Sequence, residues 1–130
     1  MILETTFLID LLRGRQEAVS KMKELEGSHL PLFIATPSIV ELWSGIVRFN
    51  RPQSEKIKIL QTISEQLILD LTKEAAVEAG KIDGTLVKTG KEIEPEDSMI
   101  AGIAITNHEA VLTRNTEHFR RVMGLTTERY

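Results

Sequence analysis

Three carboxylates and two further polar side chains stand beside short apolar runs, each in a separate segment of the chain: Glu4, Glu41, Asp97, Asn115 and His118. If those runs are strands of one parallel sheet, the side chains meet at the carboxyl ends of the strands, where such sheets bind ligands. Several carboxylates crowd together in low dielectric only when their charge is offset, commonly by a metal ion. Oxygen-rich sites suit Mg²⁺ or Mn²⁺. One ion, or two about 3.5–4 Å apart, would activate water for phosphodiester hydrolysis.

Each of these residues also has an ordinary structural interpretation. A glutamate at position 4 is typical of the start of a helix, and Glu41 fits a solvated helix surface. The helix dipole favours a first-turn carboxylate such as Asp97. Asn115 would serve equally as the cap of the next helix, and His118 as a surface residue. The metal-site interpretation therefore requires an architecture that brings all five to one edge.

Short apolar runs alternate with helical patterns along the whole chain. We expect strands at 1–3, 31–36, 67–71 and 110–113, with a last one near Leu125. Between them we expect helices at 6–12, 16–26, 36–49, 53–65, 72–90, 95–106 and 116–122. Thr36 is the expected N-cap of the third helix, with Pro37 at its first helical position. This alternation predicts an α/β fold in which helices cover both faces of a mostly parallel sheet.

The helix after the second strand keeps Glu41 away from its apolar side. That side has the spacing of a core-facing stripe and consists of Ile39, Leu42, Trp43, Ile46 and Val47. Glu41 lies about 200° from Ile39 and shares its face with Ser38 and Gly45. Because a glycine inside a helix costs about 1 kcal/mol relative to alanine, Gly45 predicts a close approach of another backbone.

Asp97 stands in line with the apolar side of its own helix, which carries Ile100, Ala101 and Ala104. An acid on an inward face is unusual, because an unpaired buried carboxylate is costly. This placement favours a functional position for Asp97.

Bulk composition sets outer limits on the protein class. The chain has 130 residues, enough for one domain with an ordinary core, and is 42% hydrophobic and 27% charged. No apolar run approaches the ~20 residues needed to span a bilayer, and no signal segment is recognisable, so we expect no membrane association. The absence of cysteine fits a cytoplasmic chain. A net charge of −3 leaves only local basic patches for nucleic acid.

The sequence resembles the PIN-domain ribonucleases, and in particular the VapC toxins of toxin–antitoxin pairs. The matching stretches are "ILETTFLIDLLRG", "TPSIVELWSG", "EPEDSMIAGIAITNHEAVLTRN" and "NTEHFRRVMGL", which span nearly the whole chain. The resemblance implies a three-layer α/β/α sandwich with a parallel sheet of four or five strands. It also implies a Mg²⁺- or Mn²⁺-dependent endoribonuclease that acts on RNA, forms a homodimer and is inhibited by a cognate antitoxin.

Motif by motif, the resemblance assigns roles to positions of this chain. Glu41 matches the family's acid in the helix after the second strand, and Asp97 matches the acid before "IA". Asn115 matches the polar residue after the fourth strand. Thr6 matches the small polar residue that follows the first acid by two places, and Thr113 matches a threonine that supports the site.

Two positions depart from the family pattern. The family normally has Asp where this chain has Glu4, and often Asp or Glu where it has His118. A neutral histidine can ligate metal or contact phosphate, so His118 remains a candidate ligand. Glu4 is one methylene longer than Asp, so its oxygens reach up to roughly 1.5 Å further. Because Mg²⁺ tolerates little error in its octahedral shell, we expect attenuated activity.

Supporting residues follow from spacing and charge. Asp10 lies four residues after Thr6, which places it beside the site; its alternative is a solvated side chain with Arg13 as its partner. Candidate contacts to the RNA backbone come from four basic residues: Arg13, Arg15, Arg114 and Arg120.

Two other functions compete with the nuclease. One is a PIN-like module that binds RNA or a protein partner without catalysis, its metal site spoiled by Glu4. The other is a phosphoacceptor receiver domain, also a parallel α/β fold with an acidic edge. The receiver is disfavoured because its first strand would end in an acidic pair, whereas Glu4 stands alone, and because no lysine follows the last strands.

Overall fold

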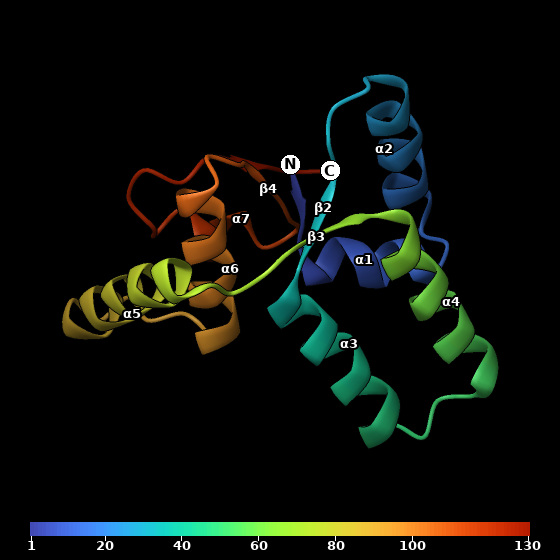
Figure 1. The fold of residues 1–130 in the computed structure, drawn as a ribbon, viewed down its shortest axis with the longest axis horizontal. Helices are drawn as coiled ribbons and strands as arrows, with labels where there is room; N and C mark the ends of the chain where they lie inside the picture. The colour runs from blue at the N-terminus through green and yellow to red at the C-terminus, as the bar shows by residue number, and fades with distance from the viewer.

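The computed structural model describes all residues from Met1 to Tyr130 as five short strands and seven helices (Figure 1). The strands are β1 (Ile2–Leu3), β2 (Phe33–Ala35), β3 (Leu67–Leu69), β4 (Val111–Leu112) and β5 (Thr127–Glu128). The helices are α1 (Thr5–Leu12), α2 (Gln16–Gly27), α3 (Thr36–Arg48), α4 (Gln53–Glu65), α5 (Lys73–Lys88), α6 (Pro95–Thr106) and α7 (Thr116–Phe119). The expected order of elements is confirmed.

The strands form one sheet in the order β3-β2-β1-β4-β5, and every neighbouring pair is parallel. Ile2 is in register with Phe33 on one side and with Val111 on the other. The chain therefore builds outward from β1 to β3 and then returns to pair β4 with the other edge of β1. This reversal creates a crevice at the carboxyl ends of β1 and β4, the position where open α/β sheets bind ligands.

Helices cover both faces of the sheet, as the sequence predicts (Figure 1). Ile2 and Val111 pack into a core with α5, α6 and α7, whereas Leu3 and Leu112 pack into a second core with α1 to α4. Successive residues of a strand point to opposite faces, so two-residue strands are enough to supply both cores. The three layers confirm the α/β/α sandwich, and the sheet has five strands.

Some element boundaries differ from those predicted. The last strand, expected near Leu125, lies at Thr127–Glu128, and the last helix ends at Phe119 rather than at residue 122. Thr36 is the first residue of α3 rather than its N-cap, which is Ala35. The Thr36 hydroxyl instead accepts a hydrogen bond from the Leu71 backbone, 3.0 Å away, and so ties the ends of β2 and β3 together.

The close backbone approach expected at Gly45 occurs elsewhere. A Cβ atom added to Gly45 would meet no atom within 4 Å, so that prediction is wrong. A Cβ atom on Gly102 would lie 2.5 Å from the Ala75 carbonyl oxygen, because α6 packs tightly against α5. The glycine that the packing requires is therefore in the buried helix α6.

None of the helices combines the length and apolar character that a membrane span requires.

Candidate active site

Glu4 follows β1 directly and is both a helix cap and a member of the site. Its carboxylate Oε2 accepts a hydrogen bond from the backbone N–H of Thr6 at 3.0 Å and so caps α1. The hydroxyls of Thr6 and Thr113 donate to the same oxygen. Glu4 is only 2% exposed, and its other oxygen, Oε1, makes no hydrogen bond within the protein. One oxygen is thus fixed and the other is left to a ligand.

Thr113 links the ends of β1 and β4. Its Oγ1 donates to Glu4 Oε2 at 2.8 Å and accepts a hydrogen bond from the Asn115 backbone at 2.9 Å. Thr6 Oγ1 in turn accepts a hydrogen bond from the backbone N–H of Arg114 at 3.1 Å. The two threonines named from the sequence therefore hold the first acid against the loop that follows β4.

Glu41 reaches the site from α3. The Thr5 hydroxyl donates to Glu41 Oε1 at 2.7 Å and lies 2.8 Å from the Ser38 hydroxyl. Burial raises the pKa of Glu41 to about 7, and the charges of Glu4 and Asp97 add to this rise while the Thr5 hydrogen bond opposes it. A carboxyl group that binds its proton this tightly is one whose negative charge lacks a compensating cation.

Asp97 and His118 form the third corner of the site. Asp97, in the first turn of α6, is 8% exposed, and its Oδ2 lies 3.5 Å from His118 Nδ1. Burial and the charge of Glu4 raise the pKa of Asp97 to about 6, although His118 opposes the rise. The expectation that Asp97 occupies an inward face is confirmed.

Asn115 is exposed at the start of α7. It occupies the N-cap position but its side chain makes no capping hydrogen bond, so the amide is free to contact a ligand. Asn115, His118 and the three acids line one common groove. Nowhere in the chain are three or more His, Asp or Glu side chains gathered closely enough to hold a metal ion as they stand. The acids face the same space without yet converging on one point.

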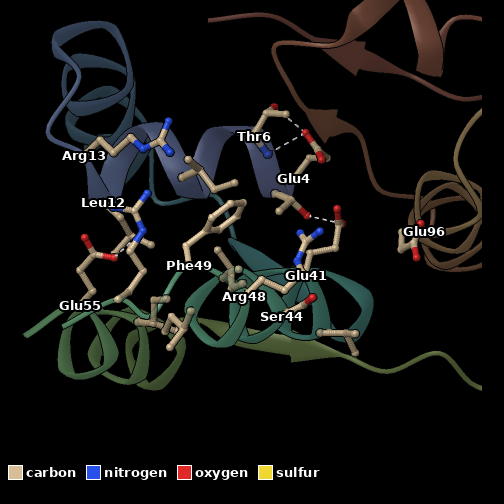
Figure 2. Close-up of a pocket in the computed structure, with 18 of the residues that line it drawn as sticks. Glu4, Thr6, Leu12, Arg13, Glu41, Ser44, Arg48, Phe49, Glu55 and Glu96 are labelled. Carbon is tan, nitrogen blue, oxygen red and sulfur yellow. Dashed lines mark hydrogen bonds and ion pairs between the residues drawn. The ribbon is translucent and has the colours of Figure 1, made fainter. Parts of the chain in front are cut away.

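The groove holds about 920 Å³ and extends well beyond the acids (Figure 2). From Glu41 it runs along α3 to Arg48 and Phe49, with α1 and α4 as its walls. Arg13 is the only RNA-contact candidate from the sequence that lines it. The groove thus has an acidic end at the strand termini and an end bounded by basic residues.

A protein-family model for the PIN domain matches residues 1–125 of the chain, almost its whole length. The chain belongs to the PIN-domain family. The fold class and the family that the motifs indicated are both confirmed.

Several curated relatives match over nearly their full length. The chain is 29% identical over 127 residues to the "tRNA(fMet)-specific endonuclease VapC" of Shigella flexneri, covering 98% of this chain and 95% of the relative. It is 31% identical over 130 residues to "Ribonuclease VapC1" of Rickettsia felis, covering 96% of this chain and 92% of the relative. Both relatives therefore have the same domain extent as this chain.

Solved structures show the same PIN architecture. VapBC from Salmonella typhimurium, bound to DNA, matches with a TM-score of 0.86 at 27% identity over 98% of this chain and 96% of that one. VapBC2 from Rickettsia felis, bound to a promoter DNA fragment, matches with a TM-score of 0.88 at 21% identity, covering 99% and 97%. The second likeness concerns the fold alone.

Asp10 lies outside the groove of this PIN domain, although it is only 2% exposed. Its carboxylate contacts Arg114 at 2.8 Å and Arg15 at 3.3 Å, and it accepts a hydrogen bond from the Tyr130 hydroxyl at 2.7 Å. The alternative prediction from the sequence, that Asp10 pairs with Arg13, is wrong. Arg15 and Arg114 are thereby engaged in an ion-pair cluster, and Arg120 is exposed just after α7, away from the groove.

Sequence reasoning did not single out Thr5, Arg48 or Phe49, which line the PIN-domain groove. Thr5 orients Glu41, and its position between Glu4 and Thr6 is the available signal. Arg48 and Phe49, at the end of α3, line the groove at a distance from the acids. They follow Glu41 by seven and eight residues, which places them on the same side of the helix. This spacing is the sequence signal that could have identified them.

Proposed function

We propose that this chain is a Mg²⁺- or Mn²⁺-dependent endoribonuclease that acts as the toxin of a toxin–antitoxin pair. The observation that carries the proposal is the convergence of Glu4, Glu41 and Asp97, from three separate elements, on one groove at the strand termini. The names of its full-length relatives, endonucleases and ribonucleases of the VapC type, support the same activity.

The donor set fits a hard divalent cation. Glu4 Oε1 is unengaged, and the raised pKa values of Glu41 and Asp97 reflect burial beside other carboxylates. A cation between them would favour their ionised forms, and carboxylate oxygens are the ligands that Mg²⁺ and Mn²⁺ prefer. We propose Glu4, Glu41 and Asp97 as ligands, with His118 completing the shell. When bound, such a cation supplies Lewis-acid stabilisation of charge on the phosphodiester.

The chain's own residues prepare the site in specific ways. Thr6 and Thr113 fix one oxygen of Glu4, so that its free oxygen faces the groove. Thr5 holds Glu41 by its Oε1, and we propose that the ionised carboxylate accepts the proton that the attacking water loses during hydrolysis. The Asn115 amide is free to orient a substrate oxygen. Asp10 supports these groups indirectly, through Arg114 and its backbone contact with Thr6.

Two partners besides RNA follow from the proposed class. Solved structures similar to this chain include VapBC complexes, so we propose a cognate antitoxin that binds over the groove. We also propose a homodimer, as the family resemblance implies.

Cleavage of RNA with and without chelator tests the proposal. Purified protein should cleave RNA with Mg²⁺ or Mn²⁺ and lose activity in EDTA, and Asp97→Asn should abolish cleavage without loss of fold. Activity that resists chelation, or that survives Asp97→Asn, would contradict the proposed chemistry. Thermal unfolding of the variant separates loss of chemistry from loss of structure.

A non-catalytic PIN-like module is the second candidate. It is favoured by the side-chain arrangement itself, since the acids are not gathered tightly and one Glu4 oxygen is already occupied by three hydrogen bonds. Titration with Mn²⁺ distinguishes the two candidates, because a folded protein that binds no Mn²⁺ would support the module.

A further inference from the structure

Phe49 is an exposed aromatic residue inside the groove, at the end remote from the acids. It is 64% exposed and lines the groove at the C-terminal end of α3. Figure 2 shows its ring lying between α1 and α3, with Leu12 and Arg13 on one side and Arg48 on the other. A large apolar ring with this exposure has no role in either core and is available to a ligand.

Basic side chains surround the Phe49 ring. The guanidinium carbons of Arg48 and Arg51 lie 5.4 Å and 5.9 Å from its centroid, which is cation–π distance. Arg13 and Lys58 also line the groove. Glu55 is the acid of this part of the groove, and it lies 3.7 Å from Arg51. The charge at this end therefore complements a polyanion.

The path from the acids to Phe49 is short, and it is open at Gly45. Glu41, Gly45 and Arg48 follow one another on one side of α3, and nothing lies within 4 Å of a Cβ position on Gly45. Eight residues of helix separate Glu41 from Phe49, roughly 12 Å at 1.5 Å per residue. That length corresponds to no more than about four stacked nucleotides at roughly 3.4 Å each. An RNA strand with one phosphate beside the acidic residues would therefore reach the Phe49 ring within a few nucleotides.

We propose that Phe49 is a base-stacking residue for single-stranded RNA in the groove, with Arg48 and Arg51 contacting the phosphates beside the stacked base. An aromatic face flanked by arginines is the arrangement by which proteins hold unpaired bases. The inference rests on the proposed nuclease function and adds a substrate contact a few nucleotides from the cleaved bond. Phe49 would be a positioning residue that acts on substrate binding.

The observations favour RNA over a protein segment as the occupant of this end of the groove. Apolar side chains such as Leu12 and Ile46 also line the groove and would suit a peptide. However, two arginines at cation–π distance from an exposed ring, with Arg13 and Lys58 lining the same groove, match a phosphate backbone with unpaired bases. The experiment therefore includes the antitoxin as an alternative outcome.

The test couples the aromatic ring to a single base. Fluorescence anisotropy measures binding of a labelled uridine RNA about ten nucleotides long, enough to span the groove. A series of the same RNA, each with a single abasic ribose at a different position, is measured in the same way. The protein carries Asp97→Asn to prevent cleavage, with Phe49 intact or changed to Leu. With Phe49 present, one or two abasic positions should weaken binding about tenfold, within the range for base–aromatic stacking. With Phe49→Leu, intact RNA should bind about tenfold more weakly and the abasic scan should be flat.

Matched variants make the result specific to an aromatic ring. Phe49→Tyr should restore the abasic response, since it keeps the ring. Val47→Ala removes an apolar side chain that is 73% exposed on the same helix but does not line the groove, and it should bind like the parent. In cleavage assays with Asp97 intact, Phe49→Leu should raise KM about tenfold and leave kcat within about twofold, the pattern of a lost binding contact.

Each outcome bears on one proposal or the other. An abasic scan that is identical with and without the ring overturns base stacking, even if the protein cleaves RNA. The same lack of difference between the two scans, combined with weaker inhibition by the antitoxin in Phe49→Leu, assigns the ring to the protein partner and also overturns base stacking. Stacking in a protein that cannot cleave any RNA would overturn the nuclease and retain the base contact. Failure to bind RNA at all would overturn both.

Discussion

Thr113 and Glu4 are joined by a buried hydrogen bond of 2.8 Å, from Thr113 Oγ1 to Glu4 Oε2, although 109 positions separate them in the sequence. The bond joins the ends of the two strands that flank the crevice. Together with the Thr6 contacts, it fixes which oxygen of Glu4 faces the groove. The position of the first acid therefore depends on a residue from the far end of the chain.

We expect Thr113→Val to lower RNA cleavage by at least about tenfold, because Glu4 loses one of the donors that fix it and errors near 1 Å in a reacting site cost about 100-fold. Unfolding should also become easier by about 1–3 kcal/mol, the cost of a lost buried hydrogen bond. Thr113→Ser is the matched control, since it keeps the hydroxyl. A normal cleavage rate in Thr113→Val would show that the bond has no part in positioning Glu4.

Glu4→Asp should raise metal-dependent cleavage, because the shorter side chain matches the family pattern at this position. Asp also remains a favourable N-cap for α1. Glu4→Gln, which keeps the length and removes the charge, should lower both Mn²⁺ binding and cleavage. The three proteins can be compared by calorimetric Mn²⁺ titration and by initial rates on one RNA. Equal rates for the parent and the Glu4→Asp variant would remove Glu4 from the metal shell.

Much of the fold follows from local patterns that tertiary contacts do not override. Short apolar runs such as 110–113 predict buried strands, and their alternation with helices implies a parallel sheet. Once that sheet is assumed, Glu4, Glu41 and Asp97 are expected at one edge, and all three do line the groove there. The strands are shorter than expected because only the residues that pair with a neighbour, such as Ile2 with Phe33 and Val111, form the ladder.

The rest of the site depends on contacts that no local pattern encodes. Two partners of Asp10, Arg114 and Tyr130, come from the far end of the sequence, so spacing within α1 does not reveal them. A glycine inside a helix lowers stability, so the sequence predicts a close backbone contact at Gly45. In the structure the space around Gly45 is open, because this side of α3 borders the groove. In the sequence Phe49 directly follows Arg48 at the end of α3, and no local pattern predicts that its side chain is exposed and lines the groove.

The pKa values of Glu41 and Asp97 predict how the metal-free protein responds to pH. Burial raises them from 4.5 to about 7 and from 3.8 to about 6, so both groups bind protons more tightly when folded. Their contribution to stability is full below the unfolded values and is lost as pH rises through about 6 to 7. In EDTA, melting temperatures from about pH 4 to 8 should fall by a few degrees more in the parent than in Glu41→Gln.

Metal ions should reverse this trend. Ligands must lose their protons to bind metal, so Mn²⁺ affinity should increase as pH rises from about 5 to 7.5. Stabilisation by a fixed Mn²⁺ concentration should therefore be largest at the high end of that range. If the melting temperatures of the parent and Glu41→Gln change with pH in the same way in EDTA, ionisation of Glu41 does not destabilise the folded protein.

Asp10 and Tyr130 allow anchoring of the chain end to be separated from support of the site. Tyr130→Phe keeps the ring that packs edge-on against Phe7, 4.9 Å between centroids, and loses only the hydrogen bond to Asp10. It should lower stability by about 1 kcal/mol and leave cleavage unchanged. Asp10→Asn also removes the charge that holds Arg114 beside Thr6, so cleavage should fall several-fold. Equal effects of the two variants on cleavage would exclude a supporting role for Asp10.

Gly45 and Gly102 should respond in opposite ways to the same substitution. Gly45→Ala fills open space in a helix interior and should stabilise the protein by about 0.5–1 kcal/mol, with cleavage retained. Gly102→Ala places a Cβ atom 2.5 Å from the Ala75 carbonyl oxygen, so α6 must separate from α5 and stability should fall. Urea unfolding measures both changes. Gly45→Leu extends the test, because its side chain would enter the groove between Glu41 and Phe49 and raise KM for RNA. A Gly45→Ala protein less stable than the parent would show that α3 packs more closely there than the structure describes.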